Sequence, residues 1–123
     1  MKELVRFLDD DRLRSRAIDL VPFGVNNYAW ERGDAISVID RLQQLGMLVL
    51  GGDVWRLTEG TLSLTYENWH CPNPDSLSDV ARCAKLAKEF VSTFAVQDSG
   101  TPVFEIVWRA PSEVGSERPP SEI

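Results

Sequence analysis

Apolar residues recur at helical spacing in the middle of the chain, between about Asp34 and Leu45. The positions that share this face are Ile36, Ile39, Leu42 and Leu45. Spacings of three and four residues are typical of an amphipathic helix. Asp34 is the predicted N-cap, and Gly46 is placed as the C′ residue that ends the helix. One face of this helix must therefore pack against another element.

A second, longer helix is predicted from Ser76 or Ser78 to about Phe94. Its apolar face is rich in alanine and consists of Leu77, Val80, Ala81, Ala84, Ala87, Val91 and Phe94. Small side chains let a helix approach other elements closely, so we expect this helix to lie against a sheet.

The N-terminal part of the chain predicts two short helices, over residues 2–8 and 10–20. The acidic residues 9–11 suit the start of the second helix, where carboxylates meet unpaired main-chain N–H groups. Pro22 and Gly24 then interrupt the helical pattern and predict a turn.

Short apolar runs separated by glycine follow the first long helix. Residues 47–50 are all apolar, which favours a central strand covered on both faces. Gly51-Gly52-Asp53 predicts a hairpin turn, because glycine adopts the positive φ angles that such turns require, and residues 54–57 form the returning strand. Glu59-Gly60 predicts another turn, after which residues 61–66 alternate as in a strand with one wet face. We expect an antiparallel meander of three strands.

The last third of the chain predicts a loop, a final strand and a tail. Residues 68–74 contain two prolines one residue apart, which exclude regular structure. Residues 102–108 alternate and predict the final strand. After Arg109 the composition turns to Pro, Ser, Glu and Gly, which predicts a disordered tail over residues 110–123.

The order of these elements indicates the α+β class. We expect a single domain over residues 1–109, in which a mostly antiparallel sheet, the three-stranded meander plus the C-terminal strand, packs with about four helices. The length of 123 residues is sufficient for one domain with its own core.

Charge narrows the classes of partner. The formal net charge is −6, and residues 24–69 hold six acidic groups but three basic ones. Such a field disfavours nucleic acid and anionic membranes and favours basic protein partners. No apolar run approaches the roughly 20 residues of a membrane span, and the N-terminus is too acidic for a signal peptide, so we expect a cytoplasmic protein.

Residues that support catalysis or metal binding are scarce. Cys71 and Cys83 are expected to be thiols in a reducing compartment, with a disulfide as the alternative. His70 is the only histidine, so no usual zinc site is expected. The glycine pair lacks the pattern of a phosphate-binding loop. We therefore expect no catalytic residue, no metal site and no cofactor.

A group of aromatic and acidic residues near the predicted turns suits binding better. Its members are Asp53, Trp55, Tyr66, Glu67, Asn68 and Trp69, with Glu31 and Glu59 as further carboxylates. Aromatic rings beside carboxylates suit the capture of Arg and Lys from a partner. The alternative is that the aromatic residues form the core. A small hydrolase that uses Asp53 and Glu67, or Cys71, is a further alternative, as is an adaptor domain.

Three short motifs resemble the Immunity protein 40 family of bacterial polymorphic-toxin and contact-dependent inhibition systems. They are residues 24–30 with the helix after them, residues 50–55 and residues 66–69, and the likeness covers about residues 12–108. Trp55 and His70 depart from the family pattern, which has tyrosine and an aromatic residue there. The resemblance implies a cytosolic α+β protein without catalytic activity that binds a cognate toxin domain, such as a nuclease, at or beside its active site.

Overall fold

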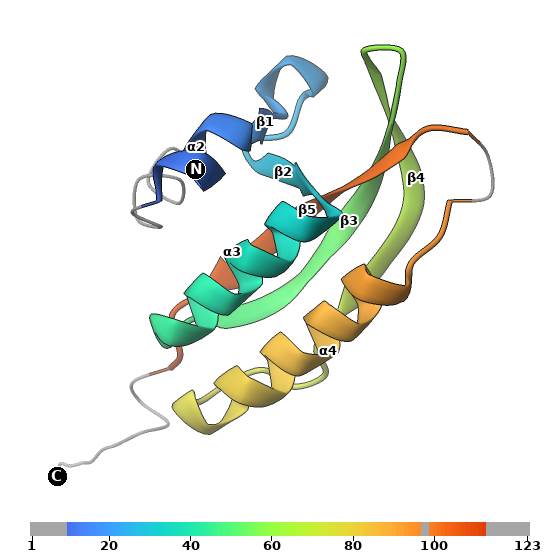
Figure 1. Ribbon diagram of the computed structural model, residues 1–123. Helices are drawn as coiled ribbons and strands as arrows, with labels where there is room; N and C mark the ends of the chain where they lie inside the picture. Colours follow the sequence, from blue (N-terminus) through green and yellow to red (C-terminus); the bar gives the residue numbers. More distant parts are fainter. Residues whose placement is uncertain (1–9, 97–98, 113–123) are drawn as a thin grey trace, which may run out of the picture.

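The sheet of this protein has five strands, each antiparallel to its neighbours, in the order β1-β2-β5-β3-β4. The strands are β1 (Ile18–Asp19), β2 (Tyr28–Glu31), β3 (Leu48–Thr58), β4 (Thr61–His70) and β5 (Thr101–Arg109). Figure 1 shows the computed structural model, which describes residues 10–96 and 99–112. β4 is an edge strand, because only β3 pairs with it.

Three α-helices and two short 3₁₀ helices accompany the sheet in the described residues. They are α2 (Asp11–Arg16), α3 (Arg32–Gln44), α4 (Val80–Thr93), η1 (Val21–Phe23) and η2 (Leu77–Asp79). The α+β class with an antiparallel sheet is confirmed. The described residues hold three α-helices and not about four, and the meander with one added strand is wrong because the sheet has five strands. The predicted helix over residues 2–8 and most of the predicted tail lie outside the described residues.

Helices α3 and α4 cover one face of the sheet, which we call the helix face (Figure 1). The main core lies between these helices and alternate strand residues, because successive side chains of a strand point to opposite faces. Its buried members are Leu13, Trp30, Ala35, Val38, Ile39, Leu42, Val49, Val54, Trp69, Ala84, Ala87, Val91, Phe104 and Ile106. Lys88 on α4 also donates to Asp40 on α3, with Nζ 2.7 Å from the carboxylate.

The opposite face of the sheet, the open face, packs partly against η1 and the chain beside it. Its smaller buried cluster consists of Leu20, Ala29, Trp55, Leu62 and Val103. Phe23 of η1 lies 6.2 Å from Trp55 between ring centroids and keeps 45% of its surface exposed. Farther along the same face, Asn68, His70 and Val107 are exposed.

β3 runs without a turn through the two glycines that the sequence pattern placed in a hairpin. Both glycines pair with β4 on one side and β5 on the other. The register shifts between Val49 and Gly51, which marks a bulge. A Cβ on Gly52 would lie 1.9 Å from the carbonyl oxygen of Glu105 and 2.5 Å from the Trp69 ring. The predicted hairpin is wrong, because glycine is needed here for close packing and not for reversal of the chain.

The hairpin between β3 and β4 turns at Glu59 and Gly60, as predicted. Both residues have positive φ angles, 52° and 81°, which is the signature of a type I′ turn. β4 then continues to His70, so the first residues of the predicted loop belong to the strand. Pro72 and Pro74 exclude regular structure only after the strand has ended at His70.

Helix α2 ends earlier than the pattern indicates. α2 ends at Arg16, and Ile18 already pairs with β2, so the predicted helix over residues 10–20 is too long. Its start is confirmed, because the Asp10 carboxylate accepts the Leu13 N–H at 3.1 Å. Strands as short as β1 leave almost no periodic signal.

Asp34 lies inside the first turn of α3 and is not its N-cap, which is Glu31. The Asp34 carboxylate is nearly buried and pairs with Arg12 at 3.1 Å and Arg16 at 3.5 Å. These ion pairs hold α2 against α3. The predicted end of the helix is confirmed, because Gly46 follows the C-cap residue with φ of 74°.

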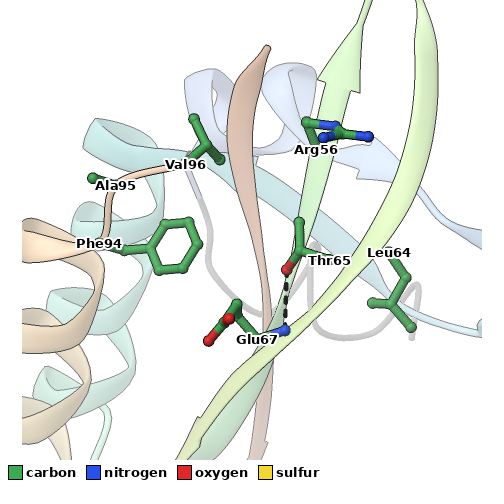
Figure 2. A pocket seen from close by; sticks show the side chains of 7 residues that line it. All are labelled: Arg56, Leu64, Thr65, Glu67, Phe94, Ala95 and Val96. Carbon is green, nitrogen blue, oxygen red and sulfur yellow. Dashed lines mark hydrogen bonds between the residues drawn. The ribbon is translucent and has the colours of Figure 1, made fainter. Parts of the chain in front are cut away.

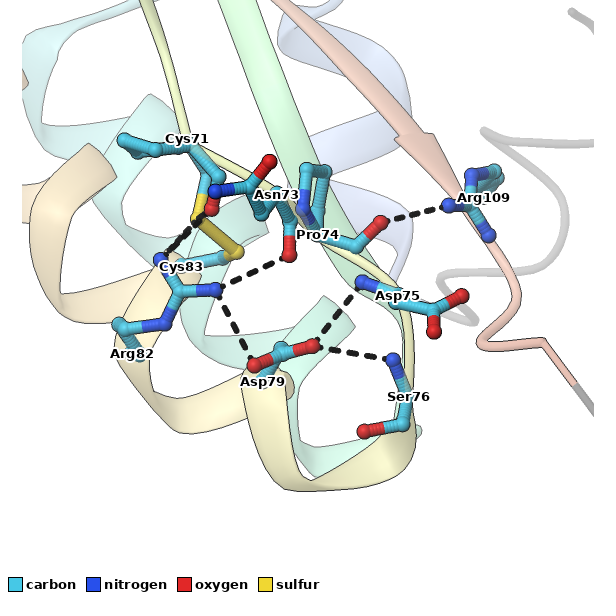
Figure 3. The surroundings of a disulfide bond; sticks show 10 residues. Cys71, Asn73, Pro74, Asp75, Ser76, Asp79, Arg82, Cys83 and Arg109 are labelled. Atoms are coloured by element: carbon cyan, nitrogen blue, oxygen red, sulfur yellow. Dashed lines mark hydrogen bonds and ion pairs between the residues drawn. A yellow bond between two sulfur atoms is a disulfide. The ribbon is translucent and has the colours of Figure 1, made fainter. Parts of the chain in front are cut away.

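Cys71 and Cys83 form a disulfide, which corrects the expected thiols. The two residues are 12 positions apart, and the return of the chain from β4 to α4 brings their Cα atoms within 5.4 Å. Both are buried. The bond therefore fastens the end of the edge strand to α4 (Figure 3).

Two arginines hold the loop that follows Cys71 (Figure 3). Arg82 donates to the carbonyl oxygens of Pro72 at 2.8 Å and Asn73 at 3.3 Å. Arg109, at the end of β5, donates to the Pro74 carbonyl oxygen at 2.7 Å. Ser76 and Asp79 then form a capping box at η2, in agreement with the predicted helix start near Ser76, although α4 itself begins at Val80.

Asp79 should make the stability of this loop depend on pH. The N–H of Ser76, the Arg82 guanidinium and the N–H of Asp75 all donate to its carboxylate and lower its pKa below the ordinary 3.8. A lowered pKa in the folded state contributes stability above about pH 4, and that stability is lost as the pH falls through the lowered pKa. We expect the melting temperatures of wild type and Asp79→Asn to differ at pH 7 and to converge towards pH 2. Melting temperatures that differ by the same amount at both pH values would contradict a lowered pKa of Asp79.

Candidate partner-binding site

The pairing of three strands brings Asp53, Asn68 and Glu105 together on the open face. Asp53 on β3 is the direct cross-strand partner of Asn68 on β4 and of Glu105 on β5. Cross-strand partners on one face have Cβ atoms about 5 Å apart. Two carboxylates and an amide therefore form a row across the sheet.

Glu105 is 6% exposed, and neutral donors hold its carboxylate in place. The Trp55 indole Nε1 donates to one carboxylate oxygen at 3.2 Å. The Asn27 amide donates to the other oxygen at 3.1 Å and also to the Ile106 carbonyl oxygen at 3.2 Å. Both donors are neutral groups, so the Glu105 carboxylate adds to the negative potential around Asp53.

A shallow hollow of about 250 Å³ lies beside this row, and we call it the carboxylate hollow. It is lined by Leu50, Gly51, Gly52, Asp53, Asn68, Trp69 and Val107. The glycines leave its floor without side chains, while Asp53 provides a half-buried acceptor and Val107 is 39% exposed. A hollow with a carboxylate and an apolar wall suits the side chain of an arginine or lysine.

A second depression, of about 490 Å³, lies on the helix face beside the edge strand, and we call it the edge cleft. Figure 2 shows its lining residues, which are Arg56, Leu64, Thr65, Glu67, Phe94, Ala95 and Val96. β3 and β4 form one wall, and the chain after α4 forms the other. The Glu67 side chain is exposed at this cleft, and the Phe94 ring faces it from the other wall.

Tyr66 stands on the edge strand between Thr65 and Glu67, which both line the edge cleft. Its φ angle is 71°, in the left-handed region, and its side chain is 81% exposed. The strand bulges here: Thr65 donates through Oγ1 to the Val54 carbonyl oxygen at 2.8 Å, and the Glu67 N–H donates to the same Oγ1 at 3.1 Å. These bonds fix the irregular backbone, so Tyr66 is held outwards.

Trp55 and Trp69 belong to the two cores, on opposite faces of the sheet. Each is 6% exposed. The Trp69 ring stacks on Phe90 of α4, with ring centroids 5.0 Å apart, and lies against Gly52. Trp55 positions Glu105, as described above. Trp55 therefore acts on the surface only by positioning Glu105, and Trp69 belongs to the main core.

Glu31 and Glu59 are exposed but lie away from both depressions in the fold. Glu31 ends β2 beside α3, and Glu59 sits at the tip of the β3–β4 hairpin. The sequence interpretation missed Glu105, Asn27 and Phe94 as parts of these sites. Glu105 did leave a signal, because it is the one charged residue within the apolar run of residues 102–108.

The arrangement gives little support to the hydrolase alternatives. Cys71 forms the disulfide with Cys83 and therefore has no thiol that could act as a nucleophile. Asp53 lines the hollow of the open face and Glu67 the cleft of the helix face, so they are not a catalytic pair. Within residues 10–96 and 99–112, no three His, Cys, Asp or Glu side chains gather as metal ligands would, and no helix has the length and apolar character for a bilayer span.

Comparison with known proteins gives one match. The sequence model described as Immunity protein 40 matches residues 19–108, which is most of the chain and includes every strand except the ends of β1 and β5. Neither the curated proteins nor the solved structures contain a match.

Proposed function

The chain belongs to the Immunity protein 40 family, and we propose that it binds the toxic domain of a cognate bacterial protein and neutralises it through the open face of its sheet. Immunity proteins neutralise toxins, so the family match carries the general function. The carboxylate hollow is the observation that supports this particular surface. It combines the Asp53 carboxylate, an apolar wall and a floor of glycine backbone on one accessible face.

The charge of the hollow supports a basic partner. Asp53 and Glu105 lie side by side, and the whole chain carries a net charge of −6. Complementary charge raises the association rate and places the partner in register. An arginine in the hollow would bind Asp53 in a charge-assisted manner and lay its carbon chain along Val107.

A nuclease is the toxin class that this surface fits best. An enzyme that binds nucleic acid must present positive potential to phosphate groups, and that potential attracts an acidic inhibitor. We propose that the hollow covers basic residues at or beside the active site of the toxin. Neither nucleic acid nor a membrane is part of this proposal, because the acidic surface repels both.

Reversal of the charge at Asp53 should weaken binding to the cognate toxin domain, which we expect the adjoining gene to encode. We expect Asp53→Lys to raise the Kd by roughly tenfold to a hundredfold, chiefly through slower association at low salt, with Asp53→Asn intermediate. Calorimetry and stopped-flow mixing measure both quantities. In cells that express the toxin, wild type should protect growth best, Asp53→Asn less well and Asp53→Lys least.

The control for this experiment is Glu89→Lys, which makes the same change of charge on the exposed side of α4. It should bind like wild type. Equal losses for both variants would assign the effect to net charge alone, and unchanged affinity of Asp53→Lys would remove the hollow from the contact surface. A failure of the wild-type chain to bind the toxin domain at all would overturn the proposed function.

A further inference from the structure

Apart from the bulge at Tyr66, the edge strand β4 lacks the usual protection of an exposed strand edge. It is 10 residues long, and no strand pairs with its outer side in the described chain. Proteins commonly guard such edges with lysine, proline or inward-pointing charge, because unpaired N–H and C=O groups attract other strands. β4 contains no Lys, Arg or Pro, and Glu67 is its one acidic residue.

Tyr66 adds a second, independent observation. A bulky residue with a left-handed backbone is an outlier, and glycine or asparagine would occupy that conformation at lower energy. The ring gives nothing back to the fold, because 81% of the residue is exposed. Strain without a structural return is typical of residues that serve binding.

The edge cleft supplies a third observation. An added strand would place alternate side chains on the helix face, where the cleft of about 490 Å³ runs beside β4. Main-chain pairing along an edge provides affinity, and pockets for alternate side chains provide selectivity. Arg56 and Glu67 are the charged residues that line the cleft, so Glu67 is the carboxylate that a basic side chain would meet, and Phe94 is the apolar surface next to it.

We propose that β4 accepts an extended basic segment of the toxin as a sixth strand of the sheet, with Tyr66 as its anchor and a lysine or arginine in the edge cleft against Glu67. This inference rests on the proposed function and specifies how the same partner is held. The occupant is a basic segment and not a second copy of this chain, because Glu67 is the one acidic residue of the edge strand and the chain as a whole repels itself at a net charge of −6.

Three substitutions test this mode of binding with the toxin domain of the adjoining gene. Tyr66→Gly relieves the left-handed strain, so it should melt at the same temperature as wild type or slightly higher, yet bind at least about tenfold more weakly. Glu67→Lys should lose at least about tenfold in affinity, with Glu89→Lys as its control. Ala95→Trp, which fills the cleft, should also weaken binding, whereas Ala81→Trp on exposed α4 should not.

Amide hydrogen exchange separates this inference from the proposed function. In the complex, exchange of the β4 amides that point away from β3 should slow, because a new strand pairs with them. A complex that forms without this protection, or that tolerates Tyr66→Gly and Glu67→Lys, overturns the inference and leaves the proposed function standing. Absence of any complex overturns both. A free chain that sediments as a dimer, with its β4 amides protected, would show that the edge belongs to a second copy.

Discussion

Gly52→Ala is expected to destabilise the protein by about 3 kcal/mol or more, an unusually large effect for the addition of one methyl group. The new Cβ would lie 1.9 Å from the Glu105 carbonyl oxygen, which is backbone and can move only if β3 and β5 separate. It would also lie 2.5 Å from the Trp69 ring, which is fixed against Phe90. Denaturant unfolding followed by tryptophan fluorescence measures the loss.

Gly33→Ala is the matched control for this substitution. A Cβ at Gly33 meets no atom within 4 Å, and the residue lies in α3, so alanine should stabilise the protein by about 0.5–1 kcal/mol. The double variant Gly52→Ala/Trp69→Leu separates the two collisions. If it remains as unstable as Gly52→Ala, the contact with the Glu105 backbone dominates. Equal stability of Gly52→Ala and wild type would contradict the close packing of β3 with β5.

Reduction of the disulfide is the second large effect that we expect. The bond closes a short loop, with Cys71 and Cys83 separated by 12 positions. Loss of a cross-link of this length lowers the free energy of unfolding by about 2–3 kcal/mol, because the unfolded chain regains its freedom. For a domain of this size the melting temperature should fall by roughly 10 °C. Calorimetry with and without a reductant measures the change.

The control is the double variant Cys71→Ala/Cys83→Ala, whose stability should equal that of the reduced wild type and ignore the reductant. Alanine suits these buried positions better than serine, whose hydroxyl groups would need partners there. Trapping of free thiols in the native host then tests the predicted cytoplasmic location. A retained bond would place the protein in an oxidising compartment, and two trapped thiols would place it in a reducing one.

The sequence predicted those parts of the fold that depend on neighbouring residues. The periodicity of α3 and α4, the stop at Gly46 and the turn at Glu59 and Gly60 all arise from local geometry. Gly51 and Gly52 misled the interpretation, because a glycine required by a distant tryptophan looks the same as a glycine required by a turn. β1 and β2 were missed because strands of two and four residues have no readable alternation.

The candidate site was less predictable for the same physical reason. Asp53 and Asn68 were identified from composition, but their partner Glu105 joins them only through the pairing of β3 with β5. Core packing was the favoured interpretation of Trp55 and Trp69 taken singly, but only the faces of the two strands decide between core and surface. The disulfide could not be predicted with certainty, because it depends on the path of the chain from β4 to α4, which sequence spacing does not give.

The ion pairs of Asp34 indicate where an expressed fragment of this protein should begin. The matched region begins at residue 19, after α2 has ended. α2 nevertheless places Leu13 in the main core, its Leu13 carbonyl oxygen accepts the Trp30 indole N–H at 2.9 Å, and Arg12 and Arg16 neutralise Asp34. A fragment trimmed to the matched region would lack Leu13 in the core. It would also leave the Trp30 indole N–H without its acceptor and the Asp34 carboxylate without its two arginines. The true folding unit therefore starts at least eight residues before the family boundary, counted from Asp11.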